Sequence, residues 1–85
     1  MLNVKSNVIK FIQLLPEKDR RIVAEHISRL EGTWPPDGDL EKLYDCRYRM
    51  HISHRYTMFL EHDGDETTIL RIMTLEQAHK RYGRI

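Results

Sequence analysis

The sequence predicts an α+β domain in which an N-terminal helical hairpin packs on a small antiparallel β-sheet and a short C-terminal helix follows. Apolar residues recur at helical spacing over residues 6–30, whereas they alternate with polar residues over residues 48–60. Thr74 followed by Gln77 has the spacing of a capping box, which predicts the last helix. A chain of 85 residues has enough apolar surface for one compact core, so residues 1–85 are interpreted as a single domain.

The predicted helical hairpin consists of two amphipathic helices. Ser6 can cap a first helix whose apolar stripe runs over residues 8–15. Pro16 ends this helix and can open the next one, because a proline at the first helical position loses no needed hydrogen bond. The second helix has an apolar stripe over residues 22–30. His26 lies on this stripe and is therefore interpreted as a histidine of the core or its boundary.

The predicted sheet begins with a hairpin over residues 48–60. A three-residue turn at residues 53–55 pairs Ile52 with Tyr56, and this register decides which side chains share a face. The face directed away from the helices carries Arg49, His51, Thr57 and Phe59. The other face, directed toward the helices, carries the apolar residues of the hairpin: Tyr48, Met50, Ile52, Tyr56, Met58 and Leu60.

The third predicted strand covers residues 67–73 and follows a turn signal at Asp63 and Gly64. A three-residue loop over residues 63–65 pairs Thr57 with Arg71, which avoids a like-charge cross-strand pair. Ile69 and Arg71 then join Phe59 on the outward face. Apolar residues on an open face suggest that another chain covers it.

The charge of the chain is nearly balanced but unevenly distributed. Fourteen Lys and Arg residues stand against 13 Asp and Glu residues, which gives a formal net charge of +1. Five consecutive blocks, residues 1–30, 31–45, 46–60, 61–76 and 77–85, carry net charges of +3, −4, +3, −4 and +3. Such blocks either form opposed surface patches or remain ordinary solvated faces. A net charge this low excludes a uniformly basic nucleic-acid-binding surface.

Composition also bears on location and on metal binding. No apolar run approaches the roughly 20 residues of a membrane span, and the N-terminus lacks the apolar core of a secretory signal. We therefore expect a cytoplasmic protein with no membrane partner. The single cysteine, Cys46, excludes an internal disulfide and fits a reducing compartment. The histidines have no metal-ligand spacing, so no metal site is expected.

Several segments, in their order and spacing, resemble the RelE/ParE-type toxins of type II toxin–antitoxin modules. The segments are FIQLLPEK (residues 11–18), LEKL (40–43), YRMHI (48–52), YTMF (56–59) and the basic ending EQAHKRY (76–82). The resemblance extends over most of the chain. It implies a RelE-like fold, a cytoplasmic complex with a cognate antitoxin, and an activity without cofactors.

In the RelE branch, which we favour, the resemblance implies cleavage of mRNA on the ribosome. The ribose 2′-hydroxyl attacks the adjacent phosphate without a metal ion, so the protein must assist proton transfer and stabilise charge on the phosphate oxygens. The candidate catalytic residues are Arg49, His51, Arg71, His79 and Tyr82. The candidate RNA contacts are Arg47, Arg55, Lys80, Arg81 and Arg84.

Two positions depart from the family pattern. Thr57 stands where an arginine is expected, and Glu76 or Gln77 stands where another is common. Arg71 or Arg55 could supply the missing guanidinium group. Two alternatives therefore stay open. The first is a ParE-like toxin that inhibits a protein target such as gyrase, and the second is a catalytically degenerate homologue that only binds its antitoxin.

Each candidate residue also fits an ordinary structural role. Arg49 and His51 fit the wet face of a half-exposed sheet, and Tyr82 fits packing of the last helix on the core. Lys80, Arg81 and Arg84 fit cations that favour a helix C-terminus, and the same three fit phosphate binding.

Overall fold

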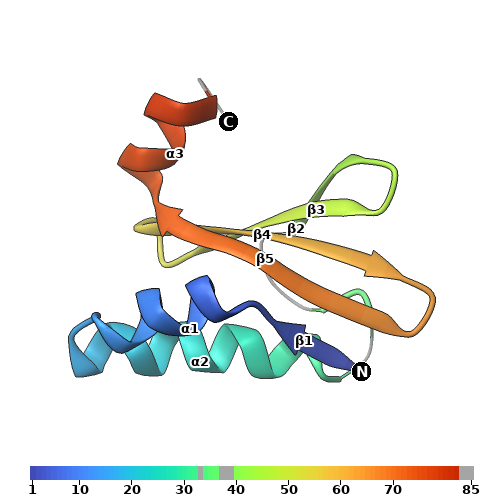
Figure 1. The fold of residues 1–85 in the computed structure, drawn as a ribbon, viewed down its shortest axis with the longest axis horizontal. Coiled ribbons are helices and arrows are strands. Elements are labelled where there is room, and N and C mark those ends of the chain that lie inside the picture. Colours follow the sequence, from blue (N-terminus) through green and yellow to red (C-terminus); the bar gives the residue numbers. More distant parts are fainter. Residues whose placement is uncertain (33, 37–39, 83–85) are drawn as a thin grey trace.

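One five-stranded sheet, with helices on both of its faces, organises the chain (Figure 1). The computed structural model describes residues 1–32, 34–36 and 40–82, with side chains as far as residue 80. Its elements are β1 (Leu2–Val4), α1 (Ser6–Gln13), α2 (Glu17–Leu30), β2 (Leu40–Tyr44), β3 (Arg47–Ile52), β4 (Tyr56–Asp63), β5 (Glu66–Thr74) and α3 (Leu75–Tyr82).

The predicted small antiparallel sheet is wrong, because the sheet is larger and mixed. The strand order is β1-β5-β4-β3-β2, and β1 runs parallel to β5 with Leu2 opposite Thr67. β1 falls where the composition of residues 2–5 favours an edge strand, and its backbone satisfies the free edge of β5: Thr67 N–H donates to the carbonyl of Met1 at 2.9 Å. On the opposite side, β2 adds an antiparallel edge strand beside β3.

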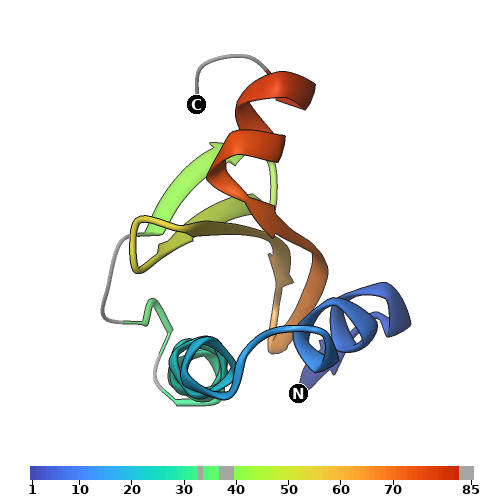
Figure 2. The same cartoon turned by 90° about the vertical axis from the view of Figure 1, so that its left-hand side faces the viewer.

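The N-terminal helices also differ from the predicted hairpin that packs on the sheet as a unit. α1 contacts β5 more extensively than it contacts α2, because β1 delivers it directly beside that strand. Figure 2 shows the sheet curved around α2, with α1 to one side and α3 on the opposite face. α2 packs against β3 inside this curve.

Apolar side chains of the concave face and of the two helices form the core. Met50, Met58, Leu60 and Ile69 have no exposed surface, and Val23 of α2 is equally buried against them. The alternation of β3 and β4 produces this face, since every second residue points toward the helices. Trp34 closes one end of the core by stacking on His62, with ring centroids 3.7 Å apart.

The predicted register of the first hairpin is confirmed, and that of the second is wrong. Ile52 pairs with Tyr56, as the three-residue turn requires. In the second hairpin Asp63 pairs with Glu66, so the loop has two residues rather than three. This loop places Ile69 opposite Leu60 on the buried face rather than outward. Farther from the turn, a bulge shifts the register between Phe59 and Leu60.

Helix boundaries agree with the expected stop signals more closely than with the expected caps. Lys5, and not Ser6, is the N-cap of α1, and it makes no side-chain capping bond. Pro16 precedes the first helical residue of α2. At α3 the predicted capping box is confirmed: Gln77 N–H donates to Thr74 Oγ1 at 3.1 Å, and Thr74 N–H donates to Gln77 Oε1 at 3.2 Å.

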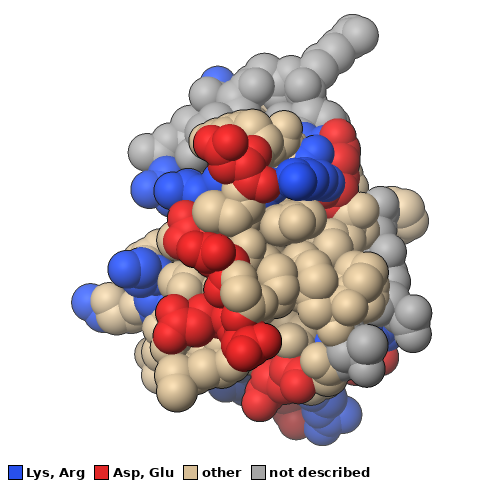
Figure 3. All heavy atoms as spheres, turned by 90° about the vertical axis from the view of Figure 1, so that its right-hand side faces the viewer, with Lys and Arg blue, Asp and Glu red and all other residues tan. Residues whose placement is uncertain are grey.

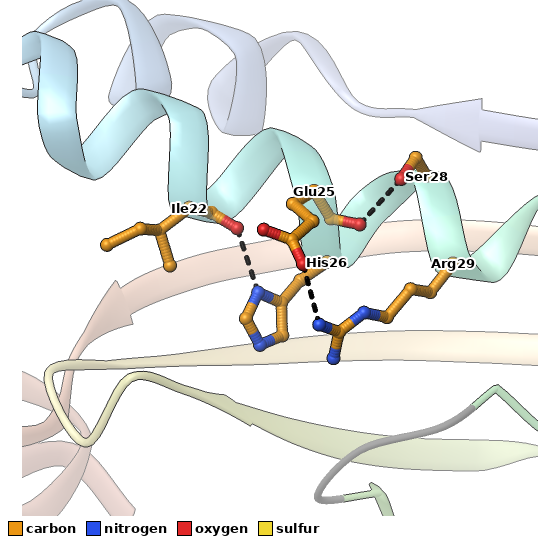
Figure 4. Close-up of polar contacts among 5 residues, drawn as sticks. All are labelled: Ile22, Glu25, His26, Ser28 and Arg29. Atoms are coloured by element: carbon orange, nitrogen blue, oxygen red, sulfur yellow. Dashed lines mark hydrogen bonds and ion pairs between the residues drawn. The ribbon is translucent and has the colours of Figure 1, made fainter.

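His26 lies half-buried on α2, as its place on the apolar stripe predicts. Its Nδ1 donates a hydrogen bond of 2.8 Å to the carbonyl of Ile22, one helical turn earlier (Figure 4). The neighbouring solvent-facing positions carry an ion pair between Glu25 and Arg29, which are 2.8 Å apart. α2 therefore has one face toward the sheet and one toward solvent.

Candidate functional site

Three candidate catalytic residues of the sheet, Arg49, His51 and Arg71, share its outward face, which is the face that α3 partly covers. Arg49 lies opposite Phe59, and Phe59 lies opposite Arg71, so these three side chains form one row across β3, β4 and β5. His51 and Thr57 form the next row, nearer to α3. The predicted pair of Thr57 with Arg71 is wrong, because Thr57 lies opposite Met73. The bulge, in which Leu70 of β5 is the extra residue, nevertheless leaves Arg71 on the predicted face.

Arg49 is neither exposed nor free on this face. Only 6% of its side chain is exposed, and its Nη2 contacts Oε2 of Glu41, the residue directly opposite on β2. The Nε of Arg49 is buried, and it has no hydrogen-bond partner among the residues that the structure describes. The carboxylate therefore engages Nη2 and leaves the neighbouring Nε without a partner among the described residues.

Arg47, also on β3, forms an ion pair with a residue of β4, the neighbouring strand on the side away from β2. Its Nε donates to Oε2 of Glu61 at 2.9 Å, and the two side chains are 43% and 36% exposed. Sequence reasoning missed both carboxylates. The pair of Arg47 with Glu61 follows from the predicted register of the first hairpin, whereas Glu41 carried no signal because β2 was not predicted.

Thr57 occupies a closed part of the outward face. Its side chain has no exposed surface, and its Oγ1 makes no hydrogen bond within the described part of the chain. An arginine at this position would have to displace packed neighbours. The packing of the sheet therefore accommodates the small side chain of Thr57 and leaves no room for the arginine of the family pattern.

Arg71 is the cation of the outward face that lies between two hollows. One, of about 560 Å³, lies between α1, β5 and α3 and includes Phe11, Gln77 and Lys80 in its lining. The other, of about 360 Å³, lies toward β2 and includes Tyr44 and Phe59. Because Arg71 lines both, its guanidinium group is placed to meet a ligand that enters from either side.

α3 carries the candidate residues of the C-terminal segment. His79 and Lys80 are exposed on it, and Lys80 Nζ lies 4.0 Å from Oε1 of Glu76. Arg81 and Tyr82 belong to α3, but their side chains lie outside the described part of the structure. Arg84 lies outside the described residues altogether.

Arg55 lies in the β3–β4 turn, apart from the other candidates. It is exposed, and its Nη1 is 3.5 Å from Oδ2 of Asp19, a buried carboxylate in the first turn of α2. The same oxygen accepts a hydrogen bond of 2.6 Å from the hydroxyl of Tyr56. This bond, with burial and the charge of Asp19, raises the pKa of Tyr56 above its usual value of 10.0. Asp19 was not singled out from the sequence, because an acidic residue in a first helical turn needs no further explanation.

Acidic side chains gather at the end of the molecule that carries the β2–β3 and β4–β5 turns (Figure 3). Asp45 lies in the first of these turns, and Asp63, Asp65 and Glu66 surround the second. α3 and the β3–β4 turn, with Lys80 and Arg55, lie toward the other end (Figure 1). The hairpin turns thus bring acidic residues of the second and fourth charge blocks together at one end of the molecule.

No helix within the described residues has both the length and the apolar character that crossing a membrane requires. No group of three or more His, Cys, Asp and Glu side chains within residues 1–32, 34–36 and 40–82 is placed to hold a metal ion.

The fold is similar to two solved structures. A chain of the RelB–RelE antitoxin–toxin complex from Methanococcus jannaschii aligns with a TM-score of 0.70 and 17% sequence identity, over 94% of this chain and 98% of that chain. The conserved hypothetical protein HP0894 from Helicobacter pylori aligns with a TM-score of 0.53 and 19% identity, over 88% of this chain and 93% of that chain. No protein-family model and no curated protein matches the sequence. At these identities the similarity establishes a shared fold.

Proposed function

We propose that this chain is the toxin of a type II toxin–antitoxin module and that it inhibits translation by cleaving mRNA on the ribosome. The observation that carries the proposal is the alignment with a chain of the RelB–RelE complex, which spans nearly the full length of both chains. A cognate antitoxin is accordingly the proposed protein partner, and the ribosome with its message is the proposed target.

The proposed reaction is attack of a ribose 2′-hydroxyl on the adjacent phosphorus. The bond from O2′ to phosphorus forms and the bond from phosphorus to O5′ breaks, which leaves a 2′,3′-cyclic phosphate and a 5′-hydroxyl. One proton leaves the 2′-hydroxyl and one reaches the departing O5′. His51 and His79 are the proposed proton carriers, because imidazole exchanges protons near neutral pH. Tyr82 remains an alternative for either transfer.

Arg71 is the proposed main contact to the scissile phosphate. It lies in the same row as Arg49 and lines both hollows. A guanidinium group binds two phosphate oxygens at once, so it can hold the substrate and stabilise the charge that develops on those oxygens. Lys80, exposed on α3 and lining one of these hollows, is the proposed second cation.

A second candidate function is inhibition of a protein target, as in a ParE-like toxin. Two observations favour it. Thr57 is enclosed where the family pattern has an arginine, and the guanidinium groups of Arg47 and Arg49 are both engaged by carboxylates. A surface with so few available cations suits a protein partner better than a phosphate backbone.

The experiment that separates these functions is expression of the chain from an inducible promoter, with and without the protein encoded beside it. Ribosome-dependent cleavage predicts growth arrest, rescue by that neighbour, and new 5′ ends within translated codons when message is mapped by primer extension. Growth arrest with intact message and impaired DNA supercoiling would contradict the nuclease and support the protein target. Absence of arrest, together with retained binding to the neighbour, would indicate a degenerate homologue.

A further inference from the structure

The contact between Arg49 and Glu41 leaves half of a bidentate site unused. A guanidinium group presents its Nε–H and one Nη–H side by side, in a spacing that matches two oxygens of one anion. Glu41 contacts Nη2 of Arg49, and Nε stays buried without a partner among the described residues. A buried donor without a partner is costly, so the site gains from an anion that engages both nitrogens.

Glu41 is placed so that it can leave this site. It belongs to β2, which is the edge strand of the sheet, and its side chain is 57% exposed. Rotation of its side chain into water would therefore return its carboxylate to full hydration, while Arg49 would stay fixed in the sheet with 6% of its side chain exposed. The fixed partner is the cation, and the movable partner is the anion.

The pair of Arg47 with Glu61 provides an internal comparison. It also joins an arginine of β3 to the acidic residue directly opposite, but both side chains are more than one-third exposed. There the donor in use is Nε itself. Water screens this second pair, and no buried donor is left over. The two pairs therefore differ in what an incoming anion can gain.

We propose that Glu41 is an internal competitor that occupies the Arg49 site, and that a phosphate group displaces it by engaging both Nε and Nη2 of Arg49. Taking the phosphate from an RNA backbone rests on the proposed function, whereas the competition itself rests on the geometry of the pair. Glu41 thereby lowers the affinity of the outward face for phosphate. A ligand that is also held elsewhere, for example by Arg71, overcomes this competition at a lower concentration.

The test is a titration of the protein, isotopically labelled, with inorganic phosphate and separately with a ribodinucleoside monophosphate. The readout is the NMR signal of the Arg49 Nε–H group, identified by its disappearance in Arg49→Lys. In Glu41→Gln we expect the phosphate concentration at half-saturation to fall by about five-fold or more, because removing one opposing charge is worth roughly this factor at a partly exposed site. Glu61→Gln, the matched control, should stay within about two-fold of the wild-type protein.

Equal affinities in wild-type protein and Glu41→Gln would overturn the proposal, and so would an equal gain in Glu61→Gln, which would indicate a general charge effect. Glu41→Ala provides a second variant that removes both charge and cover, and it should bind at least as tightly as Glu41→Gln. A gain with phosphate in a protein that never cleaves message would leave the anion site standing while the proposed function fails. If Glu41→Gln changed neither message cleavage nor phosphate binding, the competition between Glu41 and phosphate would be refuted while the proposed function would stand.

Discussion

The hydroxyl of Tyr56 donates a hydrogen bond of 2.6 Å to Oδ2 of Asp19, a residue 37 positions earlier in the chain. Both side chains are buried, and Arg55 approaches the same carboxylate oxygen at 3.5 Å. The carbonyl of Arg55 in turn accepts a hydrogen bond of 2.9 Å from the N–H of Leu75, the first residue of α3. One buried carboxylate thus connects α2, the β3–β4 turn and the start of the helix that carries His79.

Tyr56→Phe is expected to lower the free energy of unfolding by about 1–3 kcal/mol, because it leaves the buried carboxylate of Asp19 without its shortest donor. Chemical denaturation of the variant and the wild-type protein measures this difference. Tyr44→Phe is the matched control, since Tyr44 is 63% exposed and its substitution should change the free energy by no more than about 0.5 kcal/mol. Equal effects of the two substitutions would show that the buried hydrogen bond adds no more to the free energy of unfolding than an exposed hydroxyl does.

The raised pKa of Tyr56 predicts a loss of stability in alkaline solution. The bond to Asp19 favours the neutral phenol, so the folded protein holds this proton more tightly than the unfolded chain, whose tyrosines have the ordinary pKa of 10.0. The resulting stabilisation is complete below pH 10 and disappears as the pH rises through the pKa of the folded state. Unfolding measured from pH 8 to 11 should show this decline in the wild-type protein and a smaller one in Tyr56→Phe. Parallel pH profiles for the two proteins would contradict the assignment.

The parts of the fold that were predicted correctly are those decided by neighbours in sequence. The first hairpin has a three-residue turn that pairs Ile52 with Tyr56, and the capping box at Thr74 needs only Gln77 three residues later. The composition of residues 2–5 favours an edge strand, but the parallel pairing of β1 with β5 could not be predicted, because the two strands lie more than 60 residues apart in the chain. The bulge between Phe59 and Leu60 is likewise decided by the whole sheet, and it returns Arg71 to the outward face.

The candidate site was predicted in its position but not in its electrostatics. Alternation places Arg49, Phe59 and Arg71 in one row of the outward face, and a local pattern is sufficient to show this. Whether Arg49 is paired with a carboxylate depends on β2, whose sequence, LEKLY, lacks clear alternation. Because β2 was missed, Glu41 was counted with an acidic loop rather than opposite Arg49.

Thr74→Ala should loosen α3 by removing the hydroxyl that accepts the hydrogen bond of Gln77. The expected loss is about 0.5–2 kcal/mol of helix stability, which is the usual range for an N-cap. Amide hydrogen exchange within α3 measures it directly and should accelerate there, while β3 and β4 exchange as before. Thr74→Ser retains the oxygen and should restore protection. If exchange accelerated equally throughout the sheet, the cap would be part of the global fold and not a local device.

Arg71→Ala is expected to reduce message cleavage by about 100-fold, the usual cost of removing one group that stabilises charge on the reacting oxygens. Arg71→Lys should recover part of this loss, since the ammonium group retains the charge but not the two-pronged geometry. Arg29→Ala is a suitable control, because Arg29 pairs with Glu25 on α2, on the opposite side of the sheet from the outward face (Figure 4). Full activity of Arg71→Ala would remove this residue from the proposed phosphate contact.

The most direct test of the proposed function uses purified ribosomes stalled on a defined message, incubated with the purified chain. The account predicts cleavage of the message within the ribosome-bound codon, a 2′,3′-cyclic phosphate at the new end, and no cleavage of the same message without ribosomes. An intact message in both reactions, under conditions in which the chain still arrests growth, would contradict it.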